Sequence, residues 1–373
     1  MSVVLALWRN WFHDIIADAL RRAGFSVRYF RSGIGLPRMF WNFDFAEELS
    51  MAEVVRSVIE SGRRDFIITA NSGFLPAMGR LPVMYVVHLA CHPLVVRRLA
   101  GFPPEVLEGL RRHPPTAHGI LVHEGLRLYG NSKTHFLVAH EDIASAVREA
   151  YPKVGDIAVV RYPVWDSAPP EPMPYSERDI DVLMVSRYWK LGPLLGYVAE
   201  VLGKLVARGR RVVFKDYGTH AFASGRRSAS GVARYADAFR KVGVHVLVGD
   251  LSREEYLRLL SRARVVFHAS VEENFGIRIA EAMAFTPVVS ATDEFWFRSL
   301  VRVRPNEAVD VIEDLISGGE GWASTLAAQR EESLGYTLAE TLRTAESVVG
   351  IVGRYVRPTG GGLTLWTSRR GTQ

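Results

Sequence analysis

The sequence predicts an α/β protein with two domains, each built on a parallel sheet covered by helices. Short apolar runs alternate with helical patterns over residues 1–162, and the same alternation resumes at residue 179. The stretch between them, PVWDSAPPEPMPYSER at 163–178, is rich in proline and lacks periodicity. A chain of 373 residues is long enough for two domains with separate cores.

Domain boundaries follow from these patterns. We expect a first domain at 1–162, an extended linker at 163–178 and a second domain at 179–335. A closing helix is expected at 336–357, and residues 358–373, which include three consecutive glycines, are expected to form a frayed tail. In both domains the ligand edge is the one at which the parallel strands end.

Apolar runs give the expected strands of the first domain. They fall at residues 3–7, 26–30, 66–69, 83–87, 119–122, 136–139 and 157–161. Helices are expected at 11–23 and 45–59, and a loop rich in glycine, serine and arginine is expected at 217–231 of the second domain.

Composition narrows the class of protein. A hydrophobic content of 48% and a charged content of 23% are typical of a soluble globular protein, and no apolar run approaches the ~20 residues needed to span a bilayer. The single cysteine, Cys91, excludes an intramolecular disulfide and fits a cytoplasmic protein. The net charge of +6 is spread along the chain, which argues against a nucleic-acid partner.

One stretch of the second domain has the pattern of an anion site. A strand-like run at 263–268 is followed by a turn at Phe275 and Gly276, a helix that opens at Ile277, and another strand at 287–290. This order puts a helix N-terminus at the carboxyl edge of a parallel sheet. The amides of Gly276 and Ile277 would point outward there, and the helix dipole favours an anion.

Two carboxylates frame this turn. Glu273 precedes the helix, and Glu281 lies on the helix face of Ile277. Carboxylates repel a phosphate, so we interpret them as hydrogen-bond acceptors for hydroxyl groups on either side of it, one on a sugar and one on a ribose. The alternative is an acid favoured by the helix dipole together with a second, solvated glutamate.

The residues from Glu273 to Ala284, ENFGIRIAEAMA, followed by Pro287-Val288-Val289, resemble the E-x7-E signature of the retaining glycosyltransferases in the glycogen-synthase and mannosyltransferase superfamily (glycosyl transferases group 1). This resemblance implies two Rossmann-like domains facing across a cleft, the GT-B fold, with a nucleotide-diphosphate sugar held mainly by the second. It implies that Glu273 contacts the transferred sugar and Glu281 the ribose, and that the amides from Phe275 to Ile277 contact the diphosphate and the sugar. The chain departs from the family at Phe285-Thr286, which is one residue shorter and lacks the usual glycine.

The resemblance extends to the start of the second domain. Arg187 ends an apolar run and Lys190 follows shortly after, where the family has an arginine and a lysine that reach the donor diphosphate. Two cations at a strand end that faces a helix N-terminus suit a leaving diphosphate. The spacing is two residues shorter than in the family, and Ser186 replaces its glycine.

A second element of the donor site is implied at Gly249, Asp250 and Leu251. These residues resemble the family's strand-Gly-x-x-Ser element, whose backbone receives the nucleotide base. Ser252 and Glu255 have the spacing of a capping box, which predicts that a helix begins directly after this turn.

In the first domain, RLPVMYVVH ends at His88 and resembles a family strand whose terminal histidine lies at the cleft. His88 would orient the acceptor or support developing charge, and a structural role is the alternative. The turn after the first strand lacks glycine and carries Arg9, Trp11 and His13 instead. They suit an acceptor with an apolar part and an anionic group, such as a lipid-linked phosphate, although packing under the first helix explains them equally.

The sequence thus predicts a retaining glycosyltransferase, with no cofactor and no metal. Its expected partners are a nucleotide sugar and a sugar, glycan or lipid-linked acceptor. We expect it in the cytoplasm, with peripheral contact at the inner membrane face left open. Family resemblance further implies that the closing helix crosses back to the first domain. Two alternatives remain: a nucleotide-sugar epimerase of the same fold, and a catalytically silent protein that binds nucleotide sugars.

Overall fold

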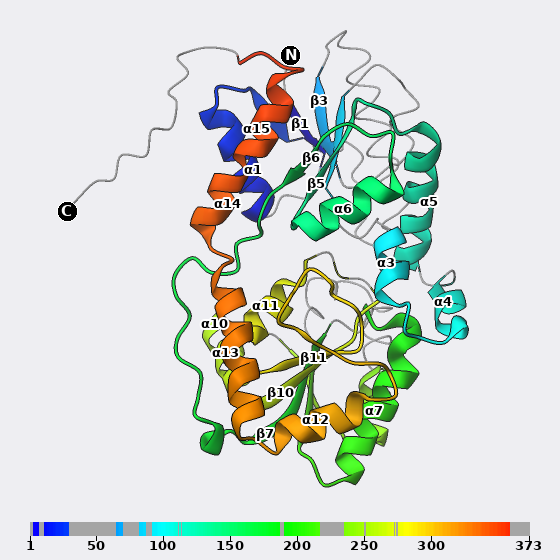
Figure 1. Ribbon diagram of the computed structural model, residues 1–373, viewed down its shortest axis with the longest axis vertical. Helices are drawn as coiled ribbons and strands as arrows, with labels where there is room; N and C mark the ends of the chain where they lie inside the picture. Colours follow the sequence, from blue (N-terminus) through cyan, green and yellow to red (C-terminus); the bar gives the residue numbers. More distant parts are fainter. Residues whose placement is uncertain are drawn as a thin grey trace, which may run out of the picture.

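The computed structural model describes residues 3–6, 11–29, 65–69, 82–86, 92–110, 112, 114–186, 190–216, 235–249, 251–271, 273 and 275–358. In these residues the chain forms two parallel sheets flanked by helices, one in the upper and one in the lower part of Figure 1. The predicted α/β class with two Rossmann-like halves is therefore confirmed.

The first sheet holds six described strands, all paired in parallel. Because helices cover both of its faces, inner strands such as β3 and β4 are buried along their whole length rather than on alternate residues, and every residue of Phe66–Thr69 is buried. In spatial order the strands are β2 (Val27–Tyr29), β1 (Val3–Ala6), β3 (Phe66–Thr69), β4 (Val83–Val86), β5 (Thr134–Val138) and β6 (Ile157–Val159).

The second sheet also holds six parallel strands among the described residues. Its central strand β7 begins directly after the predicted linker and pairs with both β8 and β10. In spatial order the strands are β12 (Val301–Arg302), β11 (Val288–Ser290), β10 (Ala263–His268), β7 (Ile180–Ser186), β8 (Val212–Asp216) and β9 (His245–Leu247).

Helices connect the strands of both sheets. In the first half they are α1 (Trp11–Arg22), α3 (His92–Arg98), α4 (Pro104–Leu110), α5 (Pro114–Tyr129) and α6 (Glu141–Ala150). In the second half they are α7 (Leu195–Ala207), α10 (Arg253–Ser261), α11 (Ile277–Met283), α12 (Ala308–Ile316) and α13 (Glu320–Leu334), with short 3₁₀ turns η2 (Tyr175–Glu177) and η4 (Gly192–Leu194).

One strand prediction is wrong. Residues 119–122 lie inside α5 and not in a strand. A run of four apolar residues fits either element, and here the 16-residue helix around it decides the outcome. The helix predicted at 45–59 and the loop predicted at 217–231 lie outside the described residues.

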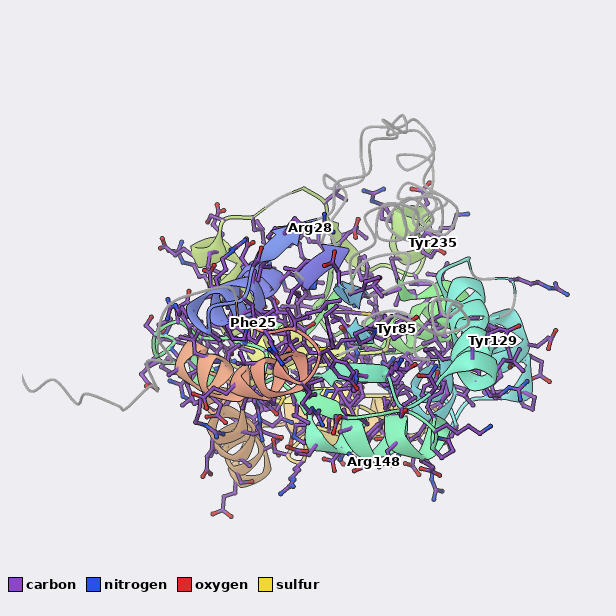
Figure 2. All side chains as sticks on the ribbon, turned by 90° about the horizontal axis from the view of Figure 1, so that it is seen from above. Phe25, Arg28, Tyr85, Tyr129, Arg148 and Tyr235 are labelled. Carbon is purple, nitrogen blue, oxygen red and sulfur yellow. The ribbon has the colours of Figure 1, made fainter. Side chains whose placement is uncertain are left out.

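The last two helices of the described residues return to the first half. Figure 1 shows α13 beside the lower sheet, and α14 (Leu338–Thr344) and α15 (Glu346–Gly353) beside α1 in the upper part. α15 packs on α1 and β6, and Phe25, labelled in Figure 2, comes so close that a Cβ added at Gly353 would meet its ring at 3.7 Å. The predicted return of the closing segment therefore occurs in two helices.

Aromatic rings join the two halves. Tyr162, just beyond β6, stacks on Phe12 of α1 at 4.0 Å between ring centroids and on Phe275 of the second half at 5.6 Å. Phe275 also meets Tyr336 edge-on at 4.8 Å. These side chains are buried, so residues beyond the carboxyl ends of both sheets share one continuous apolar core.

The α3–α4 segment also bridges the halves. It lies between β4 and β5 in the chain, yet Leu99, Phe102 and Leu110 belong to the core of the second sheet. The contact is close, because a Cβ added at Gly109 would stand 2.8 Å from Pro193 of η4. The apolar side chains of this segment therefore pack with the second sheet, although the segment connects two strands of the first.

Candidate active site

Lys190 and Glu273 form an ion pair near the carboxyl edge of the second sheet. Lys190 follows β7 and Glu273 follows β10, and Lys190 Nζ lies 2.8 Å from Glu273 Oε2. Each side chain is 17% exposed, so the pair is largely shielded from water. Burial by itself raises the pKa of Glu273, but Lys190 and His268 together hold that pKa below its ordinary value. Glu273 is therefore an ionised acceptor at neutral pH.

The turn after Glu273 has the predicted form. Gly276 has φ +81° and precedes α11, whose first bond runs from Ala280 N to Gly276 O at 3.0 Å. The positive φ favours glycine at this position, and a Cβ here would also stand 2.7 Å from Ile279 Cδ1, the end of a side chain. The ring of Phe275 is buried, and its carbonyl accepts a bond from Trp296 Nε1 at 2.7 Å. Phe275 thus offers the site only its backbone.

Glu281 lies on α11 with Arg253 as its ion-pair partner. Arg253 is the first residue of α10, directly after the N-cap Ser252, and the predicted capping box with Glu255 is confirmed. Burial raises the pKa of Glu281, and Arg253 offsets only part of this effect. The guanidinium of Arg253 also lies over the ring of Trp165, 5.4 Å from its centroid. No role was predicted for Arg253 from the sequence. Its position directly after the predicted N-cap Ser252 is the signal that could have placed it at the start of a helix near the site.

The element at Gly249 is tied to the end of β8. Lys215, which is buried, donates to the carbonyl oxygens of Asp216, at 2.7 Å, and of Gly249. Gly249 has φ +107°, a conformation that favours glycine. Leu251 follows it, and Asp250 lies outside the described residues. No role was predicted for Lys215 from the sequence. The signal that could have indicated one is the pair Lys215-Asp216 at the end of an apolar strand.

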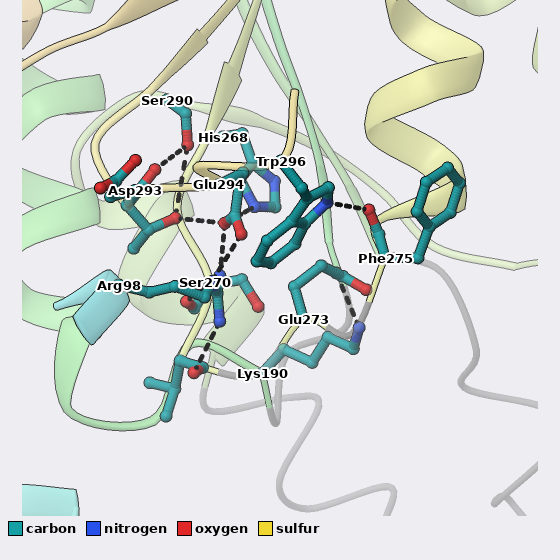
Figure 3. A network of polar contacts seen from close by, with 12 residues as sticks. Arg98, Lys190, His268, Ser270, Glu273, Phe275, Ser290, Asp293, Glu294 and Trp296 are labelled. Carbon is teal, nitrogen blue, oxygen red and sulfur yellow. Dashed lines mark hydrogen bonds and ion pairs between the residues drawn. The ribbon is translucent and has the colours of Figure 1, made fainter. Parts of the chain in front are cut away.

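A buried polar network lies beside the Lys190–Glu273 pair (Figure 3). Glu294 is fully buried and accepts bonds from Nε and Nη2 of Arg98, and from Thr292 Oγ1 at 2.8 Å. His268 Nε2 lies 3.2 Å from Glu294 Oε1. Burial alone raises the pKa of Glu294, but Arg98 and His268 lower it to about 2. Arg98 and Glu294 are 196 residues apart, so no local pattern could have paired them.

The acceptor side is only partly described. Arg9 and His88, like Arg187 on the donor side, lie outside the described residues, and of Trp11 the structure gives only the backbone at the start of α1. His13 is 3% exposed and its ring lies 6.0 Å from that of Phe12. This burial matches the interpretation of His13 as a packing residue.

Within the described part of the chain, no three His, Cys, Asp or Glu side chains are grouped to hold a metal ion. No helix there is both long and apolar enough to cross a membrane.

Solved structures of similar shape cover nearly the whole chain. The sucrose-phosphate synthase of Thermosynechococcus elongatus matches with a TM-score of 0.61 and 14% identity, over 95% of this chain and 100% of its own. The UDP-forming α,α-trehalose-phosphate synthase of Burkholderia vietnamiensis matches with a TM-score of 0.58 and 14% identity, over 95% and 100%. A glycosyltransferase of Rickettsia africae matches with a TM-score of 0.53 and 12% identity, over 95% and 99%.

These neighbours are GT-B glycosyltransferases, and the likeness shows that this chain has the same fold. No protein-family model matches the sequence, and no curated protein does.

Proposed function

We propose that this protein transfers a sugar from a nucleoside-diphosphate sugar to an acceptor, with retention of configuration. The observation that carries the proposal is the Lys190–Glu273 pair, a cation and an ionised carboxylate 2.8 Å apart near the carboxyl edge of the second sheet. Glu281 follows on the next helix, at the spacing of the E-x7-E signature. The fold shared with sucrose-phosphate and trehalose-phosphate synthases supports the proposal.

In the proposed reaction, Lys190 exchanges its contact with Glu273 for one with the donor diphosphate. Its charge then stabilises the negative charge that develops on the leaving group, which lowers the barrier to an oxocarbenium-like transition state. Glu273, released from the lysine, accepts hydrogen bonds from hydroxyls of the transferred sugar. Arg187 is proposed as a second cation, and the leaving phosphate takes the acceptor proton during attack on the same face.

The nucleotide is proposed to lie between Glu281 and the turn at Gly249. A carboxylate has about four acceptor positions, so Glu281 can bind ribose hydroxyls while Arg253 remains its partner. Lys215 holds the Gly249 carbonyl and thereby orients the turn that receives the base. The names of the structural neighbours include phosphorylated sugars, which supports an acceptor with an anionic group; a lipid-linked phosphate has the same chemistry.

The division of roles between the two glutamates can be tested with bare nucleotides. We expect calorimetry to show binding of UDP, GDP or ADP, and Glu281→Ala to weaken it at least about tenfold because the ribose loses its acceptor. Glu273→Gln should leave the affinity within about threefold, because the bare nucleotide carries no sugar. Glu331→Ala, at an exposed position on α13, is the control. Equal losses in the Glu281 and Glu273 variants would refute the assignment.

A further inference from the structure

Arg98 belongs to the first half of the chain, but its side chain forms its hydrogen bonds with the second half. It is the last residue of α3, between two strands of the first sheet, yet its side chain is fully buried against the second half. Besides the two carboxylate oxygens of Glu294, it donates to the carbonyl oxygens of Ser270, at 3.0 Å, and Val271, at 3.1 Å. Figure 3 shows the guanidinium between these acceptors.

The two carbonyls belong to the loop that leads from β10 to Glu273. From the same loop, Val271 N donates to the carbonyl oxygen of Lys190 at 2.7 Å. The guanidinium of Arg98 therefore holds the backbone that leads to Glu273. The amide of Val271 in that same backbone holds the carbonyl of Lys190. Since both members of the pair depend on this short loop, a shift of the loop would change the distance between Nζ and the carboxylate.

The loop beyond β11 completes the arrangement. Asp293 N donates to the carbonyl oxygen of Arg98 at 2.9 Å, and Trp296 Nε1 binds the carbonyl of Phe275 on the far side of Glu273. Glu294, between them, neutralises the buried guanidinium. The segment from Asp293 to Trp296 thus holds the Glu273 turn at both ends, once through Arg98 and once directly.

An arginine at position 98 is better explained by the orientation of the neighbouring chain segments than by core packing alone. An apolar side chain of similar volume would pack there without the desolvation of two charges. Arginine instead supplies five donors in a rigid fork, and here four bonds go to two separate chain segments. Lysine has no planar fork and could not hold both the carboxylate and the two carbonyls.

We propose that Arg98 is a positioning residue: from the first half of the chain it fixes Ser270 and Val271, which precede Glu273, so that Glu273 and Lys190 keep their productive geometry. This inference rests on the proposed function for its catalytic consequence. It also means that α3, a helix of the first half, contributes to the donor side. The buried guanidinium of Arg98 is what sets the positions of Lys190 and Glu273.

Arg178 provides a matched control. It is also buried and also donates to backbone carbonyls, those of Met173, Ala263 and Phe285. It lies, however, at the opposite edge of the same sheet, where β7 and β10 begin. Arg98→Met and Arg178→Met should therefore both lower the melting temperature, while only Arg98→Met should disturb the pair.

With UDP-glucose as the probe, Arg98→Met should lower kcat about 100-fold and leave KM within about threefold, because small misplacements of reacting groups have effects of this size. Arg178→Met, assayed where it is fully folded, should stay within about threefold in both constants.

The double variant Arg98→Gln with Glu294→Gln removes both buried charges. It should recover melting temperature relative to Arg98→Gln alone and yet keep the loss in kcat. Recovery of wild-type kcat in the double variant, or an equal loss in Arg178→Met, would overturn the proposal.

Hydrogen exchange provides a readout that needs no substrate. In Arg98→Met and in the double variant, the amides of residues 269–271, 275–277 and 190–192 should exchange faster than in the wild type, and in Arg178→Met they should not. Unchanged exchange in both Arg98 variants would refute the positioning role whatever the activity. If the wild type neither binds nor turns over any nucleotide sugar, the proposed function fails, and the exchange result still decides the role of Arg98.

Discussion

Replacing Lys190 with methionine is expected to lower the rate of sugar transfer by about 10²- to 10³-fold, or about 3 to 4 kcal/mol of transition-state stabilisation. The side chain is the described cation nearest to Glu273, and it is shielded enough for its charge to act strongly. Its loss would also leave the Glu273 carboxylate without its partner. The measurement is kcat with the best-bound nucleotide sugar, alongside a thermal melt.

Lys204→Met is the matched control for this variant. Lys204 also pairs with a glutamate, Glu200 at 2.6 Å, but on the exposed surface of α7. An exposed pair contributes little, so its loss should change neither kcat nor the melting temperature appreciably. Lys190→Arg should recover part of the lost rate, because it restores a cation at the same place. A Lys190→Met enzyme with kcat within about threefold of the wild type would exclude this residue from leaving-group stabilisation.

Glu294→Gln is expected to lower the free energy of unfolding at neutral pH by about 3 to 5 kcal/mol, because the buried guanidinium of Arg98 loses its counter-ion. The effect should shrink in acid. The pKa of Glu294 lies at about 2 in the folded protein, against an ordinary value of 4.5. A carboxyl with a depressed folded pKa stabilises the protein fully above the unfolded pKa and loses that contribution as pH falls toward the folded one.

Urea unfolding at pH 7 and pH 3 would measure this difference. Between those pH values the wild type should lose roughly 2 kcal/mol through Glu294, which the glutamine variant cannot lose. The gap between the two proteins should therefore narrow in acid. A gap that stays constant with pH would show that the pKa of Glu294 is the same in the folded and unfolded protein, and a gap that widens in acid would show that folding raises that pKa.

The second half could be predicted well because its signals are local. The strands on either side of Glu273, the turn at Gly276 and the helix with Glu281 all lie within some thirty consecutive residues, and apolar spacing with one glycine indicates their order. Lys190 was predicted from its resemblance to a family lysine that follows a strand, a match that uses only residues 181–192. Each of these assignments needed only the chain on either side of the residue.

What could not be predicted depends on contacts distant in sequence. Nothing near Arg98 indicates that its partner is Glu294, and nothing near Phe275 indicates that its ring packs on Tyr162. The run at 119–122 was misassigned because four apolar residues suit a strand and a helix alike. The roles predicted for Arg9 and His88 stay predictions, since both residues lie outside the described part of the chain.

The central claim, sugar transfer at the Lys190–Glu273 pair, is tested most directly by proton NMR of the protein with UDP-glucose and a panel of hexose phosphates. The proposal predicts release of UDP, a product whose new linkage keeps the anomeric configuration of the donor, and loss of both signals in Lys190→Met. Recovery of the nucleotide sugar unchanged across a panel that also includes GDP- and ADP-sugars and a polyprenyl phosphate, or its conversion to an epimer without release of nucleotide, would contradict the account.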